Sequence, residues 1–271
     1  GAALHSFVLE WKEGKYTPIA TKLPWFLRVI QDSAGELILL GQQMDRERPF
    51  NSPIVEIVWN GTQFQEGKKM KIPVGLSVYG LTLDTLANRG TEKVIAFGES
   101  DNLVIYDKTD KPLDRIHVLG GGKEIIWKSD DTFGGSNNAF SPYGRLRDND
   151  DNQITAFINP RILTYDTNND GKRELILVKN TSATGTMLRN FRFFTKSEIY
   201  DMEWDGMGLA ENWRTKQISG YVADYQIKDL DNDGQNEIVL AVVLSVGATT
   251  QQKSAIVSYK LTPQEATTST K

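Results

Sequence analysis

The feature that most constrains the fold is an arrangement of strand-forming residues that occurs four times along the chain. Each copy contains a stretch of alternating apolar and polar residues, an aspartate, a turn and then a continuous apolar stretch. Alternation with a period of two predicts a half-buried strand, and a short apolar run between turn residues predicts a buried strand. The copies begin with "LRVIQD", "GLTLD", "ILTYD" and "YQIKD", and their aspartates are Asp32, Asp84, Asp166 and Asp229.

A second hairpin, complete or partial, follows each copy, so a full unit is predicted to contain about four antiparallel strands. The N-terminal stretch "SFVLEWKEGKYTPIATKLP" is similar to this second half alone. Trp11, Trp59 and Trp204 occupy equivalent positions before a turn, and we expect them to pack between neighbouring units. No long stretch has apolar residues at helical spacing, which predicts an all-β fold and argues against α/β winding.

Four-stranded antiparallel units repeated in order are typical of the blades of a β-propeller. A β-sandwich is the structural alternative, but it does not explain why the half-units recur in order. We expect one β-propeller domain over residues 1–262, with about five blades that are partial at both ends, and a polar tail at 263–271. Either the N-terminal strands complete the last blade, or the chain is the C-terminal part of a larger propeller. The expected units are residues 4–24, 25–74, 75–136, 137–220 and 221–262.

Two of the four turns are acidic and share the pattern D-x-[DN]-x-D-G-x-x-E. Ca²⁺ binds about six to eight oxygen ligands, and carboxylates at alternate positions of a tightly turned loop supply them. The glycine lets the backbone turn where a Cβ atom would obstruct it. The backbone carbonyl of Lys172 or Gln235 is the expected additional ligand. The predicted metal-site residues are Asp166, Asn168, Asp170, Lys172 and Glu174 in one loop, and Asp229, Asp231, Asp233, Gln235 and Glu237 in the other.

An EF-hand loop begins in the same way, but it requires a glutamate at its twelfth position and helices on both sides. Here the twelfth residues are Leu177 and Leu240, inside predicted strands, so the EF-hand interpretation fails. With such a loop between the first two strands of a repeated unit, the chain resembles the FG-GAP or VCBS repeat family of integrin-α-like β-propellers. That family holds Ca²⁺ in this loop and typically has Asp at the ninth position, where this chain has Glu174 and Glu237.

The other two turns depart from the family pattern. The turn "DSAGE" at residues 32–36 is too short to enclose a cation, and "DTLANRGTEK" at 84–93 has Arg89 near the place of an acidic ligand. We therefore expect neither turn to bind metal. For the two acidic loops the alternative is an Asp-Gly or Asx turn, in which the carboxylates only accept hydrogen bonds from backbone amides.

Composition and charge argue against several classes of function. The formal net charge of -4 leaves no excess of basic residues to neutralise phosphates, so we expect no nucleic-acid partner. The longest apolar run, residues 238–244, is far shorter than the roughly 20 residues of a membrane-spanning helix, so we expect no transmembrane segment in this chain. The chain has only two histidines, and it has neither a G-x-S-x-G motif nor a phosphate-binding glycine loop. These features argue against His-dependent nucleophilic catalysis.

The resemblance implies a non-catalytic module in which structural calcium, at one or two sites, stabilises a propeller that binds a protein or a glycan. It also implies an extracytoplasmic location, whether periplasmic, cell-surface or secreted. A lipid anchor or an upstream domain in the intact protein is a further expectation. The alternative function is a carbohydrate-active enzyme, a glycosidase or lyase that uses a pair of carboxylates. The insertion at 134–153, with Tyr143, Arg145 and Arg147, is either a recognition loop or merely a mobile one.

Overall fold

The computed structural model describes residues 4–45, 48–86, 91–98, 100–107, 125–141, 155–182, 194–244 and 253–261. Every regular element within these ranges is a β-strand, and all strand pairs are antiparallel. In this described part of the chain, no helix has the length and apolar character needed to cross a membrane. The chain divides into two compact units, residues 1–85 with 91–159, and residues 86–90 with 160–271.

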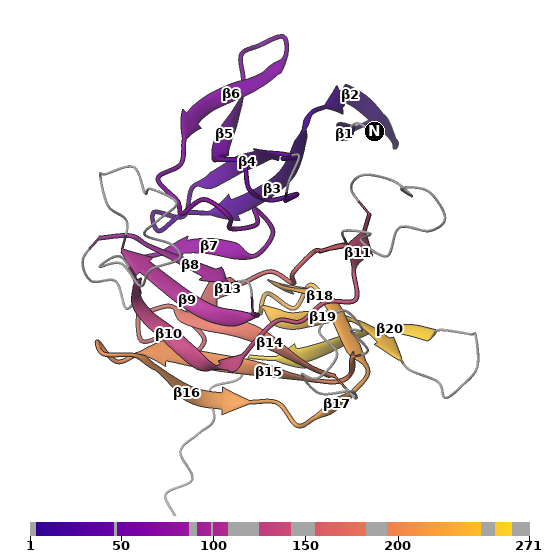
Figure 1. Cartoon of the computed structure of the whole chain (residues 1–271). Helices are drawn as coiled ribbons and strands as arrows, with labels where there is room; N and C mark the ends of the chain where they lie inside the picture. Colours follow the sequence, from indigo (N-terminus) through magenta and orange to yellow (C-terminus); the bar gives the residue numbers. More distant parts are fainter. Residues whose placement is uncertain are drawn as a thin grey trace, which may run out of the picture. The chain divides into compact units, whose positions relative to one another are not determined.

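The first unit contains two four-stranded sheets, each with its strands in sequence order (Figure 1). A separate two-stranded hairpin precedes them, and a short strand pair follows them. The hairpin is β1 (Ser6–Lys12) with β2 (Lys15–Leu23), and the short pair is β11 (Ala139–Phe140) with β12 (Ala156–Phe157). The first sheet is β3 (Trp25–Gln31), β4 (Leu37–Gln43), β5 (Ile54–Trp59) and β6 (Phe64–Lys69). The second sheet is β7 (Leu81–Asp84), β8 (Lys93–Phe97), β9 (Asn102–Asp107) and β10 (Ile125–Thr132).

The second unit contains a five-stranded and a three-stranded sheet (Figure 1). The first four strands of the larger sheet also follow sequence order, and its fifth strand pairs with β15. The larger sheet is β13 (Leu163–Tyr165), β14 (Glu174–Ser182), β15 (Phe194–Trp204), β16 (Leu209–Arg214) and β17 (Ile218–Ser219). The smaller sheet is β18 (Tyr221–Lys228), β19 (Glu237–Leu244) and β20 (Lys253–Lys260).

These four larger sheets are four of the five predicted units, so the all-β, β-propeller fold is confirmed, with four blades rather than about five. The expected first unit, residues 4–24, is the separate two-stranded hairpin. The structure also explains why the second strand is continuously apolar in three of the four repeats. The central residues of β8, β14 and β19 are buried on both faces of the strand, so neither face carries polar side chains. The first strands β3 and β18 keep exposed residues among buried ones, which matches their alternating sequences.

Each unit has its own hydrophobic core. In the first unit it includes Leu40, Leu81 and Val94, and in the second it includes Ile176, Val222 and Leu240. Buried aliphatic side chains of this kind each contribute about 1.5–3 kcal/mol relative to the exposed state.

The three equivalent tryptophans stand before hairpin turns, where they pair across the strands with Tyr16, Phe64 and Leu209. We expected these tryptophans to pack between neighbouring repeats. That expectation is wrong for two of them, because Trp11 is 62% and Trp59 is 49% exposed. Residues 142–154 lie outside the described ranges, so Tyr143, Arg145 and Arg147 of the predicted recognition loop do too.

Candidate metal centre

The two acidic loops occupy equivalent places in the two sheets of the second unit. Residues 166–174 connect β13 to β14, and residues 229–237 connect β18 to β19. The strand register pairs Tyr165 with Glu174 and Lys228 with Glu237. Because the first aspartate directly follows one member of the pair and the glutamate is the other member, the two ends of each nine-residue loop lie side by side.

In the loop at 229–237, the backbone turns through two residues with positive φ, Asn232 at 61° and Gly234 at 88°. The carboxylate of Asp229 fixes this turn: Oδ1 accepts the amide of Asp233 at 3.1 Å, and Oδ2 accepts the amide of Gly234 at 3.0 Å. The left-handed conformation is tolerated best by glycine and asparagine, which are the residues found there.

The loop at 166–174 has the same conformation. Asn169 and Gly171 have φ values of 60° and 83°. Asp166 accepts the amides of Asp170 at 3.1 Å and of Gly171 at 2.9 Å. The shared asparagine at the fourth position was visible in the sequence as a second signal beside the glycine. Two loops of different sequence therefore fold into one shape, as their common spacing indicated.

The ninth residue of each loop is a buried glutamate with one unsatisfied oxygen. Glu174 is 0% and Glu237 is 2% exposed. One oxygen of each carboxylate accepts the amide of the second loop residue, Thr167 at 2.8 Å and Leu230 at 2.9 Å. The other oxygen, Oε1 in both residues, is buried and has no hydrogen-bond partner among the residues that the structure describes. A buried carboxylate oxygen left in this way is costly unless a proton or a cation accompanies it.

Three carboxylates of the loop at 229–237 converge on one point. Within the described residues, Asp229, Asp231 and Glu237 form the one group of three acidic side chains that each place one oxygen within 4.8 Å of the others. Two ligands of a single Ca²⁺ stand at most about 5 Å apart, since each Ca–O bond is about 2.3–2.6 Å. The three side chains therefore fit the coordination of one cation, and the buried Glu237 Oε1 supplies the independent reason for one.

The fifth-position aspartates are turned toward lysines instead. Asp233 stands outside the converging group, and its Oδ2 lies 2.7 Å from Lys260 Nζ. The Lys260 ammonium lowers the pKa of Asp233, and Asp233 in turn raises the pKa of Lys260. In the other loop, Asp170 Oδ2 lies 3.4 Å from Lys172 Nζ. The pKa of Asp170 is lowered, and the largest cause is the hydrogen bond from the backbone amide of Lys172.

The loop at 166–174 also takes part in a buried acid pair that sequence reasoning missed. The Thr167 hydroxyl lies 3.0 Å from Glu174 Oε2 and 2.7 Å from Asp201 Oδ2, and Asp201 is on the neighbouring strand β15. Asn212 Nδ2 donates to the other oxygen of Asp201 at 3.0 Å. Burial raises the pKa of both Glu174 and Asp201. Both acids are 0% exposed, so a substrate does not reach this pair.

The two remaining loops differ, and the differences are local. Asp32 Oδ1 accepts the amides of Ala34 and Glu36, both at 2.9 Å, which closes a short Asx turn. Asp84 is the last residue of β7, is 0% exposed and pairs in register with Lys93. Residues 87–90 of its loop lie outside the described ranges.

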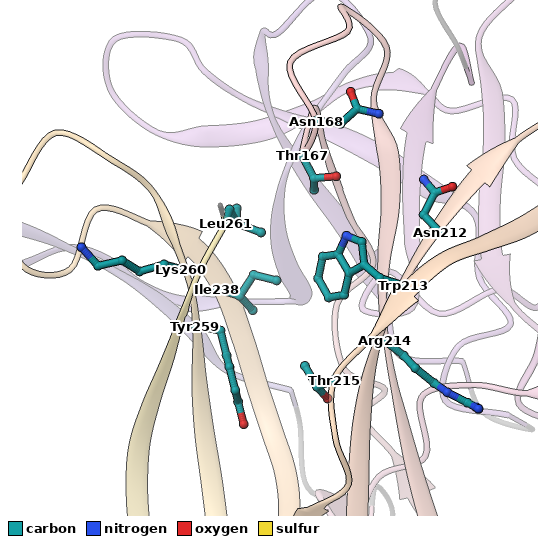
Figure 2. A pocket seen from close by; sticks show the side chains of 10 residues that line it. All are labelled: Thr167, Asn168, Asn212, Trp213, Arg214, Thr215, Ile238, Tyr259, Lys260 and Leu261. Carbon is teal, nitrogen blue, oxygen red and sulfur yellow. The ribbon is translucent and has the colours of Figure 1, made fainter. Parts of the chain in front are cut away.

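A pocket of about 380 Å³ adjoins the loop at 166–174 (Figure 2). Its walls come from that loop, from β16 and from the β19 and β20 side of the second unit. Figure 2 shows the indole of Trp213 at its centre, while the charged ends of Arg214 and Lys260 point outward. The other lining residues are Thr167, Asn168, Asn212, Thr215, Ile238, Tyr259 and Leu261.

Comparison with known proteins gives no assignment. No protein-family model matches the chain, and no curated protein matches it. The resemblance to FG-GAP and VCBS repeats therefore stays a prediction that depends on the loop pattern and the repeated units.

Proposed function

We propose that this protein is a non-catalytic binding module of the FG-GAP or VCBS type, stabilised by structural Ca²⁺ and acting outside the cytoplasm. The observation that carries the proposal is the environment of Glu237. It is buried, one of its oxygens has no hydrogen-bond partner, and its carboxylate lies with those of Asp229 and Asp231. A divalent cation at this point would give the three carboxylates a charged partner and offset two of their three negative charges.

The metal's role in this proposal is structural. The metal would be held by Asp229, Asp231 and Glu237, whose oxygens already converge in the structure. Asp233 and the backbone carbonyl of Gln235 would be further ligands. Asp166, Asn168 and Glu174 form the equivalent, less acidic set. A site of this kind exists only when the strands are paired, so the binding free energy of the metal adds to the stability of the fold.

A thermal melt tests the proposal, with the protein first in chelator and then in millimolar Ca²⁺ or Mg²⁺. At a Ca²⁺ concentration of about 100 times Kd, the stabilisation is about 2.7 kcal/mol, which raises Tm by roughly 5–10 °C for a domain of this size. The double variant Asp166→Asn with Asp229→Asn is expected to lose the shift, while Asp32→Asn, at the equivalent position of another sheet, is expected to keep it. No calcium-dependent shift in the wild type would refute the metal proposal.

Our candidate for the contact with the partner is the pocket around Trp213. An indole beside amide and hydroxyl side chains suits a sugar ring, since the ring's apolar face stacks on the aromatic group and its hydroxyls bond to the polar groups. Saturation-transfer NMR with a panel of methyl glycosides tests this in Ca²⁺. We expect transfer to the wild type and to Trp59→Ala but not to Trp213→Ala. If the wild type shows no transfer to any glycoside, a protein partner is favoured.

A further inference from the structure

In both acidic loops a lysine ammonium contacts the carboxylate of the fifth-position aspartate, although the two lysines come from different places in the chain. Lys172 is the seventh residue of its own loop. Lys260 is the last residue of β20, and it reaches the loop at 229–237 because the register pairs it with Glu237. Its Nζ lies 2.7 Å from Asp233 Oδ2 and 3.9 Å from Asp231 Oδ2.

The contact with Lys260 keeps Asp233 away from the place where the other acids converge. Both Asp233 oxygens are engaged elsewhere, Oδ1 with the amide of Gln235 at 2.9 Å and Oδ2 with the ammonium. Asp170 repeats the arrangement, with Oδ1 on the amide of Lys172 at 2.8 Å and Oδ2 facing its ammonium. The loop pattern places a ligand at this position, and in both loops it faces a cation that belongs to the protein.

We propose that Lys172 and Lys260 are internal counter-ions, which hold the fifth-position aspartates aside in the metal-free protein and are displaced by the divalent cation. Each lysine thereby sets the affinity and filling order of its loop. This inference rests on the proposed function. An ammonium near the site repels the incoming cation and competes with it for a carboxylate, so its removal strengthens metal binding.

The two lysines are held to different extents. Lys172 also donates to Glu203 Oε1 at 3.1 Å, so it has two carboxylate partners, and its side chain is 38% exposed. The Lys260 side chain is 56% exposed, with Asp233 its close partner and Asp231 farther away. The loop at 229–237 also has one more carboxylate, because its third position is Asp231 rather than Asn168. We therefore infer that this loop fills first as Ca²⁺ is raised.

Calorimetric titration with Ca²⁺ tests the proposal on the full chain. Lys260→Met keeps the length and apolar stem of the side chain, and we expect it to bind the first Ca²⁺ about three- to tenfold more tightly than the wild type. Lys253→Met, at the other end of β20, is the matched control and should leave the affinity unchanged. Lys260→Arg retains the charge and should remain near the wild type.

The outcomes separate this inference from the proposed function. If the wild type binds Ca²⁺ and Lys260→Met binds it no more tightly, the counter-ion role is wrong while the metal site stands. If no variant binds Ca²⁺, both proposals fail. A second readout does not depend on affinity: in NMR of protein labelled at lysine Cε, the Lys260 signal should move toward that of a free lysine on addition of Ca²⁺. An unmoved Lys260 signal at saturating Ca²⁺ would contradict displacement.

Discussion

Asp201→Asn should make the metal-free protein more stable at neutral pH, an uncommon result for a buried position. Thr167 has one hydroxyl hydrogen but faces two carboxylate oxygens, of Glu174 at 3.0 Å and Asp201 at 2.7 Å. The Thr167 amide also donates to Glu174 Oε2, but two buried negative charges still face a single hydroxyl hydrogen unless one of the acids takes up a proton. An asparagine amide donates to the Thr167 oxygen, which leaves the hydroxyl free to donate to Glu174. The amide oxygen still accepts from Asn212, whose Nδ2 lies 3.0 Å from the present Asp201 Oδ1.

The expected gain is about 1–3 kcal/mol in the free energy of unfolding, because the asparagine removes a buried charge that its hydrogen bonds compensate only in part. Its pH dependence has a definite sign. Burial raises the pKa of Asp201 and of Glu174 in the folded protein, so folding favours their protonated forms. Their contribution to stability is present below the ordinary values of 3.8 and 4.5 and is lost as pH rises through the raised folded values.

Urea unfolding in chelator, at pH values from about 4 to 7, measures this effect. The advantage of Asp201→Asn over the wild type should grow with pH and be nearly absent at the acidic end. Asp205→Asn is the control of opposite sign, because the amides of Met207 and Gly208 lower the pKa of Asp205, so its contribution is present at neutral pH. An Asp201→Asn protein that is less stable than the wild type at pH 7 would refute the shared-hydroxyl argument.

Two further changes probe the loop at 229–237. Glu237→Gln should weaken Ca²⁺ binding by at least about tenfold in calorimetry while leaving the metal-free protein at least as stable, because it removes a buried charge; unchanged affinity would exclude Glu237 as a ligand. Gly234→Ala should lower the free energy of unfolding by about 1 kcal/mol, because φ is 88° although no atom lies within 4 Å of the added Cβ; an equally stable variant would show that the turn relaxes.

The sequence was sufficient to predict the repeated hairpins and the common shape of the two acidic loops, because both depend on residues near one another in the chain. The alternation of "YQIKD" and the continuous run "EIVLAV" correspond to β18 and β19, and the D-x-[DN]-x-D-G spacing corresponds to a shared loop conformation. The buried acid pair was not predictable in this way. Asp201 reaches Thr167 across 34 residues, which requires knowledge of how β15 lies beside β14.

Lys260 was missed for a similar reason, since it is 27 residues from Asp233 and meets it only through the register of β19 and β20. The sequence predicts a role for the backbone carbonyl of Lys172, whereas in the structure its side chain faces Asp170. The exposure of Trp11 and Trp59 was also beyond the sequence, because a repeat pattern gives a residue's position in its hairpin but not what covers that position.

The glutamate that closes each acidic loop is also the first residue of a buried strand. The position of this loop ligand therefore depends on the register of the strand pair. Glu174 opens β14 and Glu237 opens β19. A slip of one residue in the pairing of β18 with β19 would turn Glu237 to the opposite face of the sheet, together with every apolar side chain of the strand. If the loop binds its cation only when Glu237 is in place, the slipped register would lose the binding free energy of the cation. Calcium would then favour the native register of β18 and β19 over the slipped one while the blade folds.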